Sequence, residues 1–391
     1  MSKLINKIKH IHNYSRSYLG RVVFGNFSKN LIVIGVTGTK GKTSTVELIA
    51  TALTACGYKT AVISSAHIMI GDKKILNTTG NTMIGRGRDQ KILAMAVREG
   101  CRFAIIEVSS QGAVQHRHRF IEWDAAVFMN LHPEHIDAHG GFENYREAKL
   151  DFFRYVAKSP KPVKVFFVNK EDENVAHFIS AAGDNKIVFF NGTFLKANYA
   201  AATAVAEHFG CDKQIVGVAL DNFRGVPGRV EIVVEEPFRV IVDYAHTPDS
   251  LEQVYKWAIL PSKVSNKNIK LICVLGSCGG GRDKWKRPKM GEVSAKYCDE
   301  IIVTNEDPYD ENPADIIDAV ASGAESAGKK VIKIIDRQEA IDKAVSLAED
   351  GDTVIITGKG SERYIHFAKG RKLTWSEREA AERAMKDRNK I

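Results

Sequence analysis

No stretch of the sequence is long and apolar enough to cross a bilayer, because no window offers the ~18 consecutive apolar residues that a membrane span needs. Cysteine is scarce and never forms a CxxC pair, so neither a zinc ribbon nor a disulfide framework is expected. The six cysteines are Cys56, Cys101, Cys211, Cys273, Cys278 and Cys298. We therefore expect reduced thiols and a cytoplasmic protein, with attachment to the inner face of the membrane as an alternative.

Acidic residues are absent from residues 1–30, although that segment carries six basic residues. The basic residues are Lys3, Lys7, Lys9, Arg16, Arg21 and Lys29. Apolar and aromatic residues recur there at spacings of three and four, which predicts an amphipathic helix. These residues are Leu4, Ile8, Ile11, Tyr14, Tyr18 and Val22. Two interpretations remain open: a helix docked on the protein's own body with its basic face in solvent, or a helix on an acidic membrane surface.

The remaining composition is that of a globular protein. The chain has 391 residues, which is enough for two or three domains. Its residues are 44% hydrophobic and 26% charged, and this composition excludes a wholly disordered chain and a fibrous one. A net charge of +9 favours anionic partners. Because the basic excess is concentrated in residues 1–30 and no recognition motif accompanies it, no nucleic-acid partner is expected.

A glycine-rich loop follows the apolar run of residues 31–36, which predicts a strand buried on both faces of a parallel sheet. Its glycines let backbone N–H groups approach phosphates, Lys42 adds a positive charge, and the Thr43 hydroxyl can hold Mg²⁺. Val36 stands where the strict GxxxxGK[ST] spacing has glycine, so the loop is a variant. The residues predicted to bind a nucleotide triphosphate are Gly38, Thr39, Lys40, Gly41, Lys42, Thr43 and Ser44.

Two further polar residues follow apolar runs. Glu107 closes residues 103–106 and is expected at the carboxyl end of a strand, where open parallel sheets bind ligands, within reach of a Mg²⁺ ion beside Thr43. His135 follows residues 125–129 and suits a second metal position as a neutral imidazole. The alternative for Glu107 is a solvated acid at a strand end, and a lone histidine such as His135 is more often structural.

These motifs resemble those of the Mur ligases, the ATP-dependent amide-bond-forming enzymes of peptidoglycan synthesis, and most closely the MurE branch, the UDP-N-acetylmuramoyl-tripeptide synthetases. The match extends from about residue 31 to near the C-terminus, in eight ordered segments. They are residues 38–43, 107–110, 115–117, 130–140 with Tyr145, Ala148 and Lys149, 225–231, 243–249, 279–288 and 358–362.

The resemblance implies an α/β protein with two domains. These are a P-loop central ATPase domain with a parallel sheet at residues 31–229 and a C-terminal Rossmann-like α/β domain at residues 230–391. The succession of β-rich and helical stretches agrees with doubly wound parallel sheets. Full-length members also carry an N-terminal domain that holds the uridine nucleotide, and residues 1–30 do not match it. An acceptor that is lipid-linked or otherwise lacks UDP therefore stays open. We expect a monomer.

The chemistry that the resemblance implies is acyl-phosphate formation. ATP phosphorylates a carboxylate of the muramoyl peptide, the amine of a free amino acid attacks, and phosphate departs, so positioning and charge neutralisation matter more than a covalent nucleophile. The implied catalytic residues are Lys42, Glu107, His135 and Lys149. Two Mg²⁺ ions are expected near Thr43, Glu107, His135 and Lys149, the last as a carbamylated lysine. Ligases of the folylpolyglutamate or poly-glutamate type, and a scaffold without catalysis, are the alternatives.

The resemblance also assigns residues to the substrates. Contacts to ATP are implied for Arg229, Asp243 and His246. Contacts to the muramoyl-peptide acceptor are implied for Thr78, Thr79, Ser109, Gln115 and Arg117. Contacts to the added amino acid are implied for Arg282, Asp307, Gly358 and Glu362. Branch members that add diaminopimelate show DNPR where residues 306–309 read EDPY. Because Tyr309 cannot supply the arginine charge and Asp307 favours a cation, we expect lysine or another diamino acid.

Overall fold

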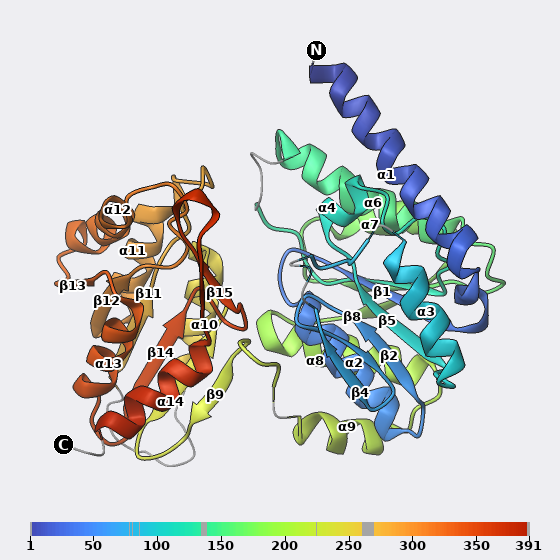
Figure 1. Cartoon of the computed structure of the whole chain (residues 1–391). Helices are drawn as coiled ribbons and strands as arrows, with labels where there is room; N and C mark the ends of the chain where they lie inside the picture. Colours follow the sequence, from blue (N-terminus) through green and yellow to red (C-terminus); the bar gives the residue numbers. More distant parts are fainter. Residues whose placement is uncertain are drawn as a thin grey trace. The chain divides into compact units, whose positions relative to one another are not determined.

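The computed structural model describes residues 2–77, 79, 81–85, 87–133, 139–223, 225–259 and 270–388, with the backbone alone for residues 2–9 and Leu76. Its contacts divide the chain into two units, Met1–Phe223 and Arg224–Ile391. This division lies a few residues before the boundary between residues 229 and 230 that the sequence predicts. Each unit is built on a mostly parallel sheet, which confirms the predicted α/β class (Figure 1).

The sheet of the first unit has eight strands among the described residues, in the order β4-β3-β2-β5-β1-β6-β7-β8. All neighbours pair in parallel except β3 with β2 and with β4. Its strands are β1 (Ile32–Thr37), β2 (Thr60–Ile63), β3 (His67–Ile70), β4 (Lys73–Leu76), β5 (Phe103–Glu107), β6 (Ala125–Phe128), β7 (Val165–Asn169) and β8 (Lys186–Phe190). The predicted strands at residues 31–36, 103–106 and 125–129 are therefore β1, β5 and β6.

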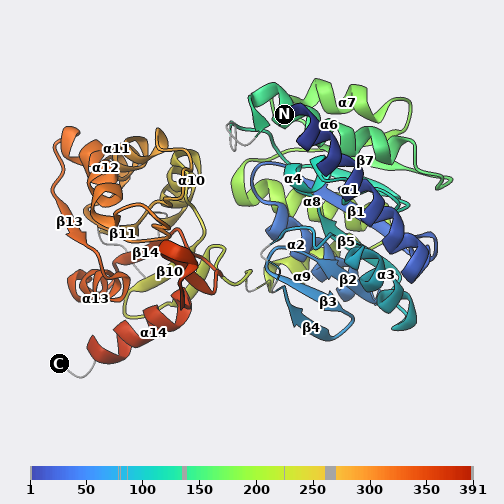
Figure 2. The same cartoon turned by 45° about the horizontal axis from the view of Figure 1, so that its top comes forward.

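Helices cover both faces of this sheet (Figure 2). Val33 of β1 packs in one apolar core with α3, α6 and α7, whereas its neighbour Ile34 packs in a second core with α2, α8 and α9. Because successive strand residues point to opposite faces, this explains why the run is apolar throughout. The helices are α1 (Ser2–Phe24), η1 (Phe27–Asn30), α2 (Lys42–Ala55), α3 (Arg88–Arg98), α4 (Ser110–Val114), α6 (Phe142–Ala157), α7 (Val175–Ala182), α8 (Phe194–His208) and α9 (Lys213–Asp221).

In the described part of the second unit the sheet has six strands in the order β13-β12-β11-β14-β10-β9, and they are parallel except for the edge strand β9. Its strands are β9 (Glu231–Val234), β10 (Arg239–Asp243), β11 (Leu271–Leu275), β12 (Glu300–Thr304), β13 (Val331–Ile334) and β14 (Thr353–Thr357), with the hairpin β15 (Tyr364–His366) and β16 (Lys372–Thr374). Its helices are α10 (Pro248–Ala258), α11 (Lys286–Tyr297), α12 (Pro313–Ser326), α13 (Arg337–Leu347), η2 (Ala368–Gly370) and α14 (Glu377–Arg388).

A disulfide joins Cys273 and Cys298, so the expectation of reduced thiols is wrong for this pair. Cys273 lies in β11, and Cys298 directly follows α11. The N–H of Asp299 donates to the carbonyl of Leu271, which returns the chain beside β11 and brings together two cysteines 25 residues apart. A search for closely spaced pairs cannot detect a contact that depends on the tertiary fold.

The predicted N-terminal helix is present as α1, and it packs on α3. It does so through small residues rather than through the predicted apolar stripe, because Ser17 is buried while Ile11 and Val22 are each 60% exposed. Docking on the protein's own body, one of the two open interpretations, is therefore confirmed, although Ile11 and Val22 of the predicted stripe face solvent. Among the described residues, no helix has the length and apolar character that crossing a membrane requires.

Candidate functional site

The glycine-rich loop connects β1 to α2 and is held by Asn130, which follows β6. The N–H groups of Thr39 and Lys40 donate to Oδ1 of Asn130 at 3.1 and 2.8 Å, and Thr39 N–H also lies 2.9 Å from the Asn130 carbonyl. Gly41 has φ of +78°, and a Cβ there would lie 2.4 Å from Oδ1 of Asn198. The loop therefore requires glycine at this position for both backbone and space.

Two lysines contact carbonyl groups of this loop. Lys42, the first residue of α2, donates from Nζ to the Thr39 carbonyl at 2.9 Å. Lys149 of α6 donates from Nζ to the Gly38 carbonyl at 2.7 Å, is 1% exposed, and lies 4.7 Å from the ring centre of Tyr145. Lys149 is thus buried against the loop, although the sequence alone is consistent with a lysine on the surface of a helix.

Glu107 stands at the carboxyl end of β5, directly beside β1, where Val36 is its parallel partner. Its Oε2 accepts a hydrogen bond from the Thr43 hydroxyl at 3.1 Å, and Ser65 donates to the same oxygen from N–H at 2.8 Å and from its hydroxyl at 3.0 Å. Sequence reasoning missed Ser65. The signal was available, because Ser65 follows β2, the other neighbour of β5, and strand ends gather at one edge of a parallel sheet.

Thr43 and Glu107 fit a magnesium ion bound with a nucleotide. Mg²⁺ prefers oxygen ligands and is commonly held by one or two carboxylates together with substrate phosphates. Both side chains are buried, at 5% and 3% exposure. In the part of the chain that the structure describes, no group of three or more His, Cys, Asp or Glu residues could hold a metal by itself. His135, the other predicted ligand, lies outside the described residues.

The residues predicted to bind the acceptor gather around Arg117. Its guanidinium donates to Oε1 of Gln115 from Nε at 3.1 Å and from Nη2 at 2.6 Å. It also donates to Oδ1 of Asn81 at 3.2 Å and to the Met83 carbonyl. Asn81 in turn is linked to Thr79, whose hydroxyl accepts from the Asn81 N–H at 3.3 Å.

Ser109 serves as the N-cap of α4, because its hydroxyl accepts from the Gly112 N–H at 3.1 Å. The close approach of Gly112 to Met83 places this helix start against the same segment that Arg117 contacts. The structure thus brings Thr79, Ser109, Gln115 and Arg117 into one region of the first unit. Thr78 lies outside the described residues.

In the second unit, the three predicted ATP-contacting residues lie around the carboxyl end of β10. Asp243 accepts hydrogen bonds from the N–H groups of Val230 and Ala245, both at 2.7 Å. Burial raises the pKa of the Asp243 carboxyl, although the positive charge of Arg229 acts to lower it. The Arg229 guanidinium lies 4.1 Å from the ring centre of Tyr244. Nδ1 of His246 lies 2.8 Å from the Tyr244 carbonyl, which can only accept, so Nδ1 carries the proton.

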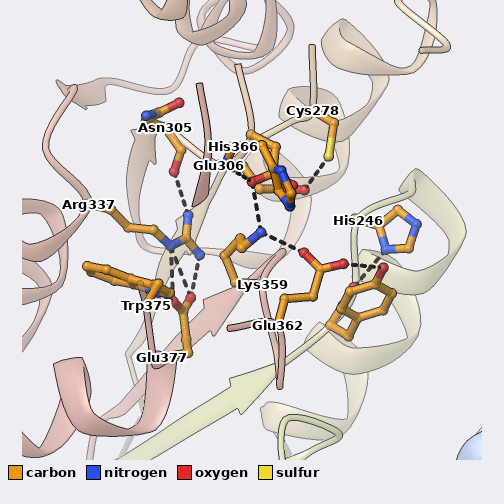
Figure 3. A network of polar contacts seen from close by, with 12 residues as sticks. His246, Cys278, Asn305, Glu306, Arg337, Lys359, Glu362, His366, Trp375 and Glu377 are labelled. Carbon is orange, nitrogen blue, oxygen red and sulfur yellow. Dashed lines mark hydrogen bonds and ion pairs between the residues drawn. The ribbon is translucent and has the colours of Figure 1, made fainter. Parts of the chain in front are cut away.

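Lys359 joins two residues predicted to bind the added amino acid (Figure 3). Its Nζ donates to Oδ1 of Asp307 at 2.9 Å and to Oε2 of Glu362 at 2.6 Å, and the lysine is 0% exposed. Asp307 is buried, whereas Glu362 keeps 41% of its side chain exposed and also accepts from the Tyr244 hydroxyl at 3.0 Å. The cation that Asp307 meets in this structure is therefore Lys359, which sequence reasoning missed.

Glu306 is a buried carboxylate beside this lysine cluster. Oε1 of Glu306 accepts a hydrogen bond from the Cys278 thiol at 2.8 Å, whereas Oε2 has no hydrogen-bond partner among the described residues. Burial raises the pKa of the Glu306 carboxyl. A Cβ on Gly358 would lie 2.6 Å from Glu306 Oε2, so glycine at 358 leaves room for the carboxylate. Arg282 donates to the Tyr309 hydroxyl at 3.3 Å. Cys278 and Glu306 were also missed, because their proximity depends on two different strand ends.

A buried ion pair between Arg337 and Glu377 fixes the backbone segments that carry this site. Arg337, at the start of α13, donates to the carboxylate of Glu377 and to the carbonyls of Asn305 at 2.8 Å and Thr357 at 2.7 Å. The indole N–H of Trp375 donates to the same carboxylate at 2.5 Å. Arg337 therefore ties the end of β14 to the segment that carries Glu306 and Asp307.

Comparison with family models gives two matches. The Mur ligase middle domain matches residues 36–229, and the Mur ligase glutamate ligase domain matches residues 228–360. The two matches meet near the boundary between the two units.

Curated relatives match over most of the chain. A UDP-N-acetylmuramoyl-L-alanyl-D-glutamate–2,6-diaminopimelate ligase of Syntrophomonas wolfei is 34% identical over 396 residues, covering 92% of this chain and 79% of that protein. A UDP-N-acetylmuramyl-tripeptide synthetase of Treponema denticola is 31% identical over 423 residues, covering 94% and 79%. A solved UDP-N-acetylmuramoyl-L-alanyl-D-glutamate–2,6-diaminopimelate ligase superposes with a TM-score of 0.63 at 28% identity, covering 96% of this chain and 83% of its own. FolC of E. coli in complex with ADP shares the fold, with a TM-score of 0.70 at 18% identity over 96% and 94% of the two chains.

Proposed function

This chain belongs to the Mur ligase family, and from that premise we propose that it joins a free amino acid to the carboxylate of a muramoyl peptide in the cytoplasm. It is an ATP-dependent, ADP-forming acid–amino-acid ligase of the type that serves peptidoglycan synthesis. The observation that carries the proposal is the contact of Thr43 with Glu107, a hydroxyl and a carboxylate that meet beside a phosphate-binding loop at the edge where β1 and β5 end.

The reaction proceeds in two steps. The acceptor carboxylate attacks the γ-phosphorus of ATP, which gives an acyl phosphate and ADP; the amine of the amino acid then attacks the acyl carbon, and phosphate leaves. Transfer of this kind depends on positioned positive charge and N–H donors rather than on a covalent nucleophile. Asn130 orders the glycine-rich loop by accepting from the N–H groups of Thr39 and Lys40, and Lys42 places its ammonium within that loop. The loop would bind the phosphates of ATP at the start of α2.

Magnesium enters this proposal at two positions. When bound, Mg²⁺ neutralises charge on the transferred phosphoryl group. Thr43 and Glu107 would hold the first ion, and Ser65 orients Glu107 for that task through two hydrogen bonds. His135 and Lys149 are proposed for the second.

Carbamylation of Lys149 would convert the buried ammonium into an anionic oxygen donor suited to Mg²⁺. The support is the position of Lys149, 1% exposed and 2.7 Å from the Gly38 carbonyl of the loop. Protein equilibrated with ¹³C-bicarbonate should show one carbamate carbon resonance by NMR. That signal should be absent from Lys149→Arg, and its persistence in this variant would place the modification elsewhere.

The acceptor is proposed to be a muramoyl dipeptide. The support is the cluster of Arg117, Gln115, Thr79 and Ser109 in the first unit, because a guanidinium suits an acidic group of such an acceptor. Relatives of this chain are named as ligases of muramoyl peptides, which supports the same assignment.

For the added amino acid we propose lysine or another diamino acid without a distal carboxylate. Tyr309 stands where an arginine would be needed for that carboxylate. Arg282, which donates to the Tyr309 hydroxyl, also contacts Cys278. Meso-diaminopimelate is the second candidate, because relatives 34% identical are named for it.

Phosphate release tests both parts. With ATP, Mg²⁺ and UDP-N-acetylmuramoyl-L-alanyl-D-glutamate, release should require one member of a panel containing lysine, ornithine and meso-diaminopimelate, and Glu107→Gln should abolish it. Ser180→Ala on the exposed face of α7 is the matched control and should not change the rate. If no amino acid causes phosphate release in a preparation that binds ATP, the UDP-linked acceptor is rejected. Lipid-linked and folate acceptors would then be assayed in the same way.

A further inference from the structure

The orientation of α1 on its unit is fixed by two glycines. A Cβ on Gly20 would lie 2.2 Å from the Cα of Gly87, and a Cβ on Gly87 would lie 2.5 Å from the Cα of Gly20. Contact this close is possible only for glycine on both sides. Ser17, one turn away, is 5% exposed. The face of α1 that carries Ser17 and Gly20 must therefore point towards the start of α3.

The opposite face of α1 is mostly apolar and exposed, with Ser15 and His12 as its exposed polar residues. Ile11, Leu19, Val22 and Val23 keep 60%, 57%, 60% and 62% of their surface in solvent. At about 100° of helix rotation per residue these four residues fall within about 120° of the helix circumference, so they form one surface, which we call the α1 apolar face. In both views α1 (dark blue) lies on the outside of its unit (Figures 1 and 2).

The contacts that attach α1 lie beside this face and do not cover it. Tyr14 and Tyr18 pack edge-on against Phe120 with ring centroids 5.0 and 5.4 Å apart, yet they remain 48% and 54% exposed. Nδ1 of His10 lies 3.2 Å from Nε2 of His116. Tyrosines at the border of an apolar surface are typical of helices that lie at a membrane–water interface.

The positive charge of residues 1–30 indicates what binds the α1 apolar face. Residues 1–30 carry six basic residues and no acidic residue, and Arg16 of α1 is exposed. A second copy of the chain would bring two such basic helices together and would incur repulsion. A bilayer with acidic headgroups instead offers an apolar interior for the four aliphatic residues and negative charge for the basic ones.

We propose that α1 binds in the plane of a membrane surface that contains acidic lipids, with the α1 apolar face buried in the lipid. The ligase units then work next to the bilayer, as peripheral rather than spanning parts. This inference goes beyond the ligase reaction and does not depend on which amino acid is added.

Vesicle sedimentation with the full chain tests the proposal. The protein should sediment with phosphatidylcholine vesicles that contain phosphatidylglycerol, about tenfold more than with phosphatidylcholine alone, and added salt should weaken the binding. Leu19→Asp combined with Val22→Asp should reduce binding to the level of neutral vesicles, and Arg16→Glu should weaken it. Val218→Asp on α9 is the matched control, because Val218 is also an exposed valine, at 63%, and should leave binding unchanged.

Circular dichroism and phosphate release with soluble substrates verify that the double variant is folded and retains its active site. Equal binding of the wild type to neutral and acidic vesicles, or undiminished binding of the folded double variant, would overturn the proposal. A wild-type dimer that the double variant dissociates, with no vesicle binding by either protein, would overturn it in favour of a second copy as the occupant.

Discussion

Ser65 donates two hydrogen bonds to one oxygen of Glu107, from its N–H at 2.8 Å and from its hydroxyl at 3.0 Å. Thr43 donates a third to the same oxygen. These three donors, two from Ser65 after β2 and one from Thr43 at the start of α2, hold the carboxylate in one orientation at the edge of the sheet. If Glu107 binds Mg²⁺ as proposed, this fixed orientation would lower the cost of organising the site.

Replacing Ser65 with alanine removes one of these donors and keeps the backbone one. A hydrogen bond to a charged group contributes about 1.5–3 kcal/mol, so kcat/KM of Ser65→Ala should fall roughly 10- to 100-fold. The loss should shrink as Mg²⁺ is raised, because the metal then orients the carboxylate itself. Phosphate release across a Mg²⁺ titration measures this. A loss that stays constant at all Mg²⁺ concentrations would contradict a role in orienting Glu107.

Lys359 neutralises two acidic residues, and its removal should cost stability. In Lys359→Met the carboxylate of Asp307 remains buried without a cation, which typically costs about 3–5 kcal/mol. Urea unfolding should show this loss, and Asp307→Asn in the same chain should recover a large part of it. Lys333→Met is the control, because Lys333 pairs with Asp318 and Glu325 on the surface and should cost about 0–1 kcal/mol. Equal losses for the two lysines would contradict the structure.

The elements of the site that lie close together in sequence could be predicted. The loop with Lys42 and Thr43 is local, and Glu107 follows from the rule that parallel strands present their carboxyl ends at one edge. The Lys359–Asp307 pair joins residues from two different strand ends. No local pattern encodes such a contact, so the sequence predicts that the cation beside Asp307 comes from a ligand rather than from the protein.

Periodicity likewise predicts that α1 is a helix but not which side faces inward. In most surface helices the apolar residues lie on the buried side. Here the contact of Gly20 with Gly87 overrides the pattern, because only the side with the smallest residues permits that approach. The Cys273–Cys298 disulfide is missed for a similar reason, since 25 residues separate its partners.

Asp89 should make the stability of the first unit depend on pH. Burial raises the pKa of its carboxyl to about 6, against opposing hydrogen bonds from the backbone and the charge of Arg117. The folded state thus binds the proton more tightly than the unfolded chain, so this stabilisation is complete below about pH 4 and is lost as pH rises through 6. At about 1.4 kcal/mol per pKa unit the total is about 3 kcal/mol.

The variant Asp89→Asn lacks this titration. The difference in unfolding free energy, variant minus wild type, should rise between pH 4 and pH 6.5 and then level off. Urea unfolding of both proteins at matched pH values gives the difference and cancels other titrating groups. A difference independent of pH would show that Asp89 has an ordinary pKa.

A side chain at position 41 should weaken ATP binding because it collides with Asn198, in addition to straining the backbone. A Cβ at Gly41 would lie 2.4 Å from Oδ1 of Asn198, so Gly41→Ala must displace the loop as well as adopt a positive φ. We expect the Kd for ATP to rise about tenfold or more, since misplaced N–H donors no longer converge on the phosphates.

Gly57→Ala is the matched control, because Gly57 has a similar φ of +84° with nothing within 4 Å. Gly57→Ala should cost about 1–2 kcal/mol of stability and leave ATP affinity unchanged. Calorimetric titration with ATP compares the two variants, and equal affinities would show that Asn198 moves aside and that the loop tolerates a methyl group.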